Sequence, residues 1–213
     1  SPSASRPPAP YRLVYDGRWY QVWQRPVSLR RPIIDSLPLG DSIDPTGVPA
    51  CSDVLHLARE AGPGGLLAAV ARPAPAVISV SSPLPSGDTT AHFATTHGGL
   101  YEVWLGGSFS RRLTTSVDGV TIGSSREVLN EPGEWTPLGA ARLGASEHRI
   151  TLSYGDSQLY PGSGGGGRAG PFLPVGPLAV TPVTHSLPVT YLAPADARAL
   201  CGKPWDWVEA LGS

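Results

Sequence analysis

The sequence predicts a mainly β protein, a jelly-roll β-sandwich with a small α+β layer on its N-terminal side and short C-terminal helices. Residues 98–154 carry hydrophobic alternation with a period of two, and turn residues divide this stretch into short strands. Short strands at this spacing are typical of sandwiches and jelly rolls rather than of parallel sheets. A helical pattern at 52–61 indicates the additional α+β layer.

The predicted sandwich strands follow one another between glycine-rich turns. Gly98-Gly99 precedes the run 100–105, whose odd-numbered residues share one face. The runs 113–117 and 120–122 flank Asp118-Gly119, a dipeptide that favours a type I′ hairpin turn. Further strands are expected at 134–139 and 148–154.

The N-terminal part predicts a linker, a hairpin, one helix and short strands. Residues 1–10 have the composition of an extended linker. Residues 11–24 alternate around Asp16-Gly17 and predict a hairpin, whereas residues 26–50 predict irregular structure. The helix is expected at 52–61, with an apolar stripe formed by Val54, Leu57, Ala58 and Ala61. Strands are expected at 66–71 and 76–80.

The C-terminal part predicts two more strands and then helices. Residues 178–181 and 189–192 have β character, and helices are expected at 194–200 and 205–211. The predicted organisation is a linker at 1–10, an α+β layer at 11–85 packed on the sandwich, the jelly roll at 86–193, and a helical tail at 194–213.

Several motifs together resemble a carbohydrate-binding jelly-roll module. They are Gly-Gly-x-Tyr-x-Val-Trp-Leu-Gly-Gly-Ser-Phe from Gly98, then Val-Asp-Gly-x-x-Ile-Gly, Trp-x-Pro-Leu-Gly and Leu-Gly-Ala-x-x-His-x-Ile-x-Leu. Residues 11–26 and 37–42 are similar to the C-terminal extracytoplasmic region of actinobacterial multi-spanning membrane glycosyltransferases. This resemblance implies a module whose catalytic membrane part lies outside the sequence, at the extracytoplasmic face of the plasma membrane.

Composition and charge exclude some function classes. The net charge is −1 and no stretch concentrates Lys and Arg into a stripe, which argues against binding nucleic acid or anionic lipid. Gly and Pro are frequent, with 26 and 24 residues, so we expect many loops around an aromatic-containing core. Neither a membrane span nor a signal peptide is expected within the sequence. As a fragment, the chain is expected to be a monomer.

The two cysteines, Cys51 and Cys201, belong to no C-x-x-C motif, so metal binding through them is not expected. A disulfide would close a loop of about 150 residues and contribute on the order of 4–5 kcal/mol. The alternative is two buried free thiols.

Catalytic patterns are weak, and the fragment is expected to have no activity of its own. Gly40-Asp41-Ser42 and Gly155-Asp156-Ser157 resemble the nucleophile block of serine esterases but lack its strand context, so capped turns are the favoured interpretation. His92 and His97 would face opposite sides of a strand, so no metal site is predicted. No cofactor is expected, and calcium, although possible, is not indicated by the sequence.

A sugar site needs only an aromatic platform and a few polar groups. The candidates are Trp104, Glu102, Trp135, Asp156 and Tyr160. Trp104 is either a sugar platform or buried beneath the N-terminal layer, and the second alternative moves the ligand to the loops around Trp135, Asp156 and Tyr160.

The predicted function is a non-catalytic extracytoplasmic module of a membrane glycosyltransferase. It would bind or position a cell-envelope polysaccharide or glycolipid. The alternative is a structural domain that docks on the transmembrane portion of its own chain and has no ligand of its own.

Overall fold

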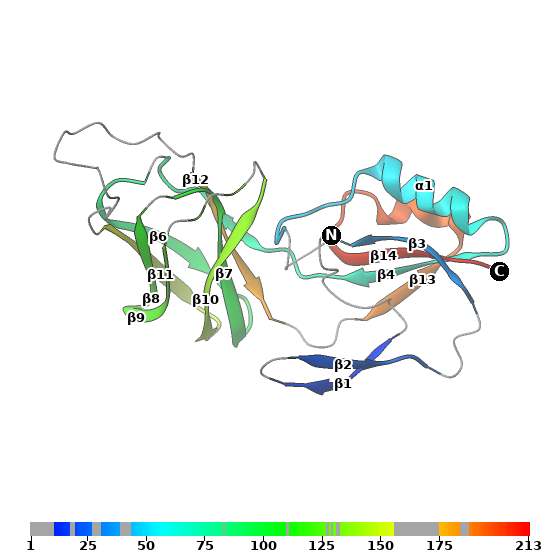
Figure 1. The fold of residues 1–213 in the computed structure, drawn as a ribbon, viewed down its shortest axis with the longest axis horizontal. Coiled ribbons are helices and arrows are strands. Elements are labelled where there is room, and N and C mark those ends of the chain that lie inside the picture. The colour runs from blue at the N-terminus through cyan, green and yellow to red at the C-terminus, as the bar shows by residue number, and fades with distance from the viewer. Residues whose placement is uncertain are drawn as a thin grey trace, which may run out of the picture. The chain divides into compact units, whose positions relative to one another are not determined.

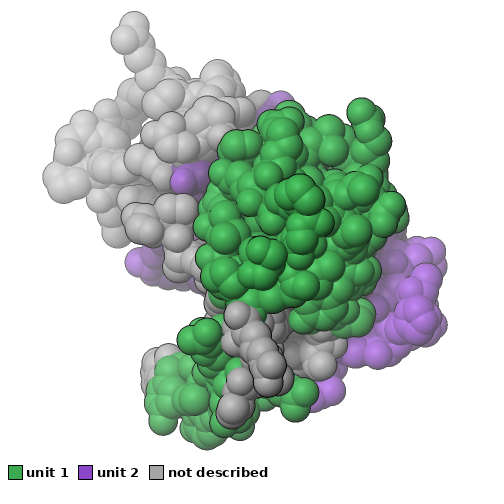
Figure 2. Space-filling view, turned by 90° about the vertical axis from the view of Figure 1, so that its right-hand side faces the viewer, with its two compact units in different colours: residues 1–74, 184–213 green, residues 75–183 purple. Residues whose placement is uncertain are grey.

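The computed structural model describes residues 11–17, 20–26, 31–38, 44–82, 84–109, 111–126, 128, 130, 133–155, 175–183 and 188–213. The chain divides into two compact units. Both ends of the chain form unit 1, residues 1–74 and 184–213, and the middle forms unit 2, residues 75–183 (Figure 2). None of the described helices is long and apolar enough to cross a membrane.

Unit 2 is a sandwich of two four-stranded antiparallel sheets (Figure 1). One sheet has the order β10-β7-β12-β5 and the other has the order β6-β11-β8-β9. The strands are β5 (Ala76–Ile78), β6 (Gly87–Ala94), β7 (Gly99–Gly107), β8 (Arg112–Val117), β9 (Val120–Ser125), β10 (Trp135–Leu143), β11 (Glu147–Gly155) and β12 (Val175–Pro182).

The strand pairing confirms the jelly roll. The antiparallel pairs are nested, with β8 beside β9, β7 beside β10, β6 beside β11 and β5 beside β12. A long antiparallel ribbon that is folded over in this way distributes its strands over two facing sheets. Their inner faces bury one shared cluster, with Val103 and Leu105 from one sheet and Ile150 and Leu152 from the other.

Asp118 and Gly119 form the turn between β8 and β9, with φ angles of 50° and 82°. Two successive positive φ angles are what a type I′ turn requires, and Asp and Gly tolerate them better than most residues. The predicted hairpin is therefore confirmed.

Unit 1 contains a four-stranded antiparallel sheet in the order β13-β4-β14-β3. Helix α1 (Cys51–Ala61) and the 3-10 helix η1 (Pro194–Leu200) contribute to the core on one face of this sheet. The predicted apolar stripe of α1 is the side that is buried. The strands are β3 (Ile33–Pro38), β4 (Leu66–Ala71), β13 (Val189–Leu192) and β14 (Trp205–Leu211).

A separate two-stranded sheet, β1 (Arg12–Asp16) with β2 (Gln21–Gln24), is the predicted hairpin around Asp16-Gly17. Its register shifts between Leu13 and Tyr15 because Val14 forms a bulge.

Several expectations were wrong. Residues 205–211 are a strand rather than a helix, because β14 pairs with β3 on one side and β4 on the other and is buried along its whole length. Residues 33–38, predicted to be irregular, form β3. The predicted sandwich at 86–193 begins too late and ends too late, since β5 pairs with β12 inside the sandwich and β13 pairs with β4 in unit 1.

Cys51 and Cys201 form a disulfide with a Cα–Cα distance of 4.9 Å. This confirms the predicted bond and excludes the alternative of two free thiols. The bond joins the start of α1 to the residue after η1, so it links the two chain segments that build unit 1 from opposite ends of the sequence.

Reduction of this disulfide should destabilise unit 1. The bond spans 150 residues, and the loss of so long a loop constraint should lower the free energy of unfolding by about 4–5 kcal/mol on the chain-entropy account. Denaturant unfolding with and without reductant measures the difference, and the Cys51→Ser/Cys201→Ser double variant should match the reduced protein and no longer respond to reductant. An unchanged unfolding midpoint after verified reduction would contradict the expectation.

Candidate binding face and buried histidine cluster

Three predicted site residues lie on the outer face of the β10-β7-β12-β5 sheet. Along β7, Tyr101, Val103 and Leu105 point into the sandwich core, so Glu102 and Trp104 point outward. Trp135 pairs directly with Gly106, the next outward position of β7. Two tryptophans and one carboxylate therefore share a sheet face that takes no part in the sandwich core.

Trp104 and Trp135 differ in accessibility. The Trp104 side chain is only 5% exposed, which favours burial over an open sugar platform. Its indole N–H has no hydrogen-bond partner among the described residues. Trp135 is half-buried, and its ring lies against Gly106, where a Cβ atom would be 3.6 Å from the indole. Trp135 is thus the more accessible ring of this face.

Asn130 anchors the chain beside Trp135. Its side-chain amide donates to the carbonyl oxygen of Gly107 at 2.9 Å and to Oγ1 of Thr136 at 3.0 Å. Its backbone N–H donates to Oγ of Ser108 at 2.8 Å. These bonds fix the connection before β10 and hence the place where Trp135 begins the strand.

The predicted candidates Asp156 and Tyr160 lie outside the described residues, and so do the two serines of the esterase-like blocks, Ser42 and Ser157. Their roles remain predictions.

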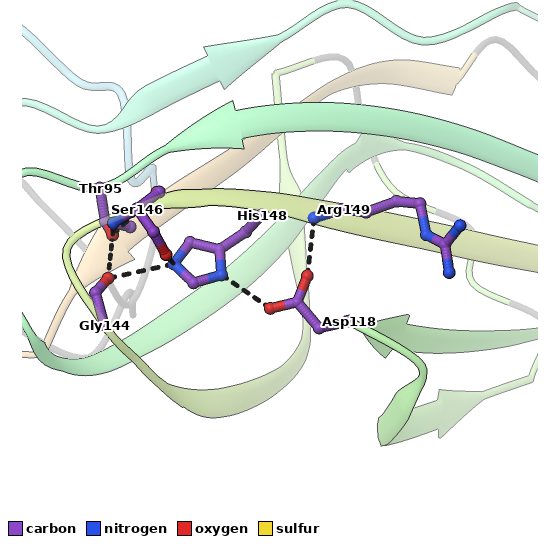
Figure 3. Close-up of polar contacts among 6 residues, drawn as sticks. All are labelled: Thr95, Asp118, Gly144, Ser146, His148 and Arg149. Atoms are coloured by element: carbon purple, nitrogen blue, oxygen red, sulfur yellow. Dashed lines mark hydrogen bonds and ion pairs between the residues drawn. The ribbon is translucent and has the colours of Figure 1, made fainter.

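A buried histidine forms a polar cluster at one end of the sandwich (Figure 3). The His148 side chain is 6% exposed, and its Nδ1 lies 2.7 Å from Oδ2 of Asp118, a residue of the β8–β9 turn. Its Nε2 lies 3.0 Å from the Gly144 carbonyl oxygen and 3.2 Å from Oγ of Ser146, both in the β10–β11 turn. The Thr95 hydroxyl, just after β6, also donates to the Gly144 carbonyl.

The partners of His148 shift two pKa values. The hydrogen bond to Asp118 raises the pKa of His148 above its ordinary 6.5, and the bond to the Gly144 carbonyl acts in the same direction, whereas burial opposes both. The backbone N–H of Arg149, 2.9 Å from Oδ1, holds the pKa of Asp118 below its ordinary 3.8, and the bond to His148 adds to this effect. The charged pair is therefore favoured in the folded protein.

Asp118, His148 and Ser146 are the residue types of a serine hydrolase triad, but their geometry does not suit that chemistry. A general base needs a free lone pair on Nε2 to accept the serine proton. Here the Gly144 carbonyl, which only accepts hydrogen bonds, faces Nε2 at 3.0 Å, so Nε2 carries a proton. The cluster instead holds two turns and the end of β6 together.

The sequence alone does not predict this cluster. A signal was present, because the alternation of His148, Ile150 and Leu152 places the histidine on the buried face of β11. The sequence pattern marks its partner, Asp118, only as a turn residue.

The histidines considered for a metal site are separated by the structure. His92 lies within β6 and is exposed, whereas His97 lies beyond the end of this strand. The described residues contain no group of three or more His, Cys, Asp or Glu side chains that could hold a metal ion.

No protein-family model and no curated protein matches the sequence. Among solved structures, the chain is similar to the GH26-CBM35 β-(1,4)-mannanase of Podospora anserina, at 11% identity and a TM-score of 0.35, over 56% of this chain and 28% of that one. It is also similar to a ruminal GH26 endo-β-1,4-mannanase, at 13% identity and a TM-score of 0.33, over 70% of this chain and 26% of that one. The chain thus spans about a quarter of the length of each, and similarity at this level does not establish a shared function.

The histidine cluster should make the stability of the sandwich depend on pH. Because the pKa of His148 is raised in the folded state, its contribution is fully present below pH 6.5 and is lost as the pH rises through the raised value. Because the pKa of Asp118 is lowered, its contribution is present above pH 3.8 and is lost as the pH falls through the lowered value. Chemical unfolding at a series of pH values measures this profile.

Two variants test the assignment. His148→Gln should lower the free energy of unfolding by about 1.5–3 kcal/mol near pH 5, because it removes charge-assisted bonds from a buried site. Asp118→Asn keeps an acceptor for the Arg149 N–H and tolerates a positive φ, so it should preserve the turn while reducing the loss of stability at high pH. A wild-type pH profile in Asp118→Asn would contradict the assignment.

Trp104 should behave as a buried residue. Trp104→Ala should lower the free energy of unfolding by about 3–5 kcal/mol, as expected for a large-to-small substitution at a buried site. Trp104→Phe should cost less, because it keeps a ring and removes an N–H that has no acceptor among the residues that the structure describes. Denaturant unfolding of the three proteins measures both changes, and equal losses in the two variants would show that ring packing is not the main contribution.

Proposed function

We propose that the chain is a non-catalytic extracytoplasmic module of a membrane glycosyltransferase, and that it binds or positions a cell-envelope polysaccharide or glycolipid. The observation that carries the proposal is the position of Trp135, Trp104 and Glu102 on one outward face of the sandwich. A sandwich needs apolar side chains on its inner faces, and the shared core cluster is complete without these tryptophans. An accessible aromatic ring with a polar group beside it on an outer face suits the C–H faces and hydroxyls of sugars.

Within this face, the accessible ring of Trp135 is the stacking platform, and Glu102 is the acceptor for sugar hydroxyls. Trp104 supports the sheet beneath rather than contacting the sugar, since its side chain is buried. This arrangement follows the second of the two predicted alternatives, in which the ligand moves toward Trp135.

Two features support the non-catalytic and extracytoplasmic parts of the proposal. In the triad-like cluster of Asp118, His148 and Ser146, Nε2 of His148 donates to a carbonyl oxygen, so the histidine does not supply a base. Disulfides such as Cys51–Cys201 form and persist in oxidising compartments. The glycosyltransferase context rests on the sequence resemblance alone.

A glycan-array screen of the chain, repeated with a Trp135 variant, tests the proposal. Trp135→Ala should weaken binding to every uncharged glycan retained by the wild type, on the order of tenfold for the loss of one aromatic contact. Tyr191→Ala is the matched control, because Tyr191 is an exposed aromatic residue of unit 1, and it should bind glycans as the wild type does. The absence of any bound glycan would favour the alternative, a structural domain that docks on the transmembrane portion of its own chain.

A further inference from the structure

The β1–β2 hairpin presents one exposed side. Arg12 pairs with Gln24 and Tyr15 pairs with Val22, so these four side chains share a face, and alternation adds Tyr20. All five are exposed, with Tyr15 at 50% and Tyr20 at 63%. We call these five residues the tyrosine face. They belong to neither the sandwich core nor the helix-covered core of unit 1.

The two tyrosine rings are held in place by the turn. Their centroids are 5.3 Å apart, with an angle of 31° between the ring planes. The backbone N–H of Gly17 donates to the Tyr20 carbonyl at 3.0 Å, and a methyl group on Gly17 would overlap the Tyr15 ring. Tyr15 therefore packs against the glycine backbone and remains 50% exposed. A platform fixed in this way loses little conformational entropy when a ligand binds.

Polar groups lie beside the rings. The guanidinium of Arg12 takes part in no ion pair among the described residues. The segment 11–26 contains three arginines and one aspartate, although the whole chain has a net charge of −1. An arginine binds a carboxylate through two parallel hydrogen bonds, and the Gln24 amide can both donate to and accept from hydroxyl groups.

The size and chemistry of the tyrosine face favour a polysaccharide over a protein. A stable protein interface takes about 20–30 residues from each partner, whereas this face offers five side chains on two strands. A polysaccharide contacts a narrow strip of this kind through ring stacking and hydrogen bonds. Arg12, the charged residue of this face, favours a polysaccharide that carries negative charge.

We propose that the tyrosine face is a second glycan site that binds an acidic polysaccharide, with sugar rings on Tyr15 and Tyr20 and a carboxylate on Arg12. This site is built from residues of unit 1 alone, whereas the Trp135 face is built from residues of unit 2. It therefore does not depend on Trp135 as a platform.

Isothermal titration with polygalacturonate and with a neutral galactan of the same length tests the proposal. The wild type should bind polygalacturonate more tightly than galactan, and added salt should weaken this binding because it screens the Arg12 contact. Tyr15→Ala and Tyr20→Ala should each weaken binding on the order of tenfold. Arg12→Gln should remove the preference for the acidic polymer.

Matched controls are available in unit 1. Tyr191→Ala removes a tyrosine with the same 50% exposure as Tyr15, and Arg59→Gln removes an exposed arginine of α1. Both should bind polygalacturonate as the wild type does. Melting temperatures of the hairpin variants should stay unchanged, since these residues contribute to neither of the two large cores.

Four results would overturn the proposal. They are unchanged affinity in the Tyr15→Ala/Tyr20→Ala double variant, equal affinity for the two polymers, no binding of either polymer, and binding of phosphatidylglycerol vesicles in place of polygalacturonate. Loss of polygalacturonate binding in Trp135→Ala with full binding in the double variant would place the glycan on the sandwich. That result would overturn the tyrosine-face site and leave the proposed glycan-binding function standing.

Discussion

Mutual burial of two sheet faces is the constraint on which unit 2 depends. Nested antiparallel pairing brings Val103 and Leu105 of one sheet against Ile150 and Leu152 of the other, and it excludes water from both inner faces. A shift of the strand register by one residue would turn every inner side chain of that strand outward. The outward position of Glu102 and Trp104 is therefore a consequence of core packing. The candidate glycan face exists because the core does not use these two outward positions.

The packed core also determines how the end of the sandwich that contains His148 is stabilised. Charged groups rarely lie inside such a core, and His148 does so because Asp118 and the Gly144 carbonyl accept its two N–H protons. The aspartate carboxylate is itself 48% exposed, so the pair places one partner in water and one against Phe93. This division keeps desolvation small for the carboxylate. It also explains why Asp118, His148 and Ser146, a triad-like set of residues, have a structural role.

The two proposed glycan sites differ in how their aromatic rings are supported. Trp135 lies over Gly106 at the edge of a sheet that is anchored by a packed core, so its platform depends on the stability of unit 2. Tyr15 and Tyr20 lie on a two-stranded hairpin, a structure that is marginal without further contacts, and their support is the turn at Gly17. An exposed aromatic cluster with polar neighbours suits a glycan-binding module better than a purely structural domain.

The sequence by itself determined the local elements. Alternation in residues 100–105, the stripe of Val54, Leu57, Ala58 and Ala61, and the Asp118-Gly119 turn are properties of neighbouring residues, and two cysteines allowed only one pairing. Only the tertiary structure decided the rest. Residues 205–211 became a strand because β3 and β4 both pair with them, and burial on two faces removes the alternation that identifies a strand. Likewise, His148 contacts Asp118, 30 residues away in the sequence, because β11 pairs with β8. Strand order depends on pairing between segments that are distant in the sequence, and short-range periodicity does not encode it.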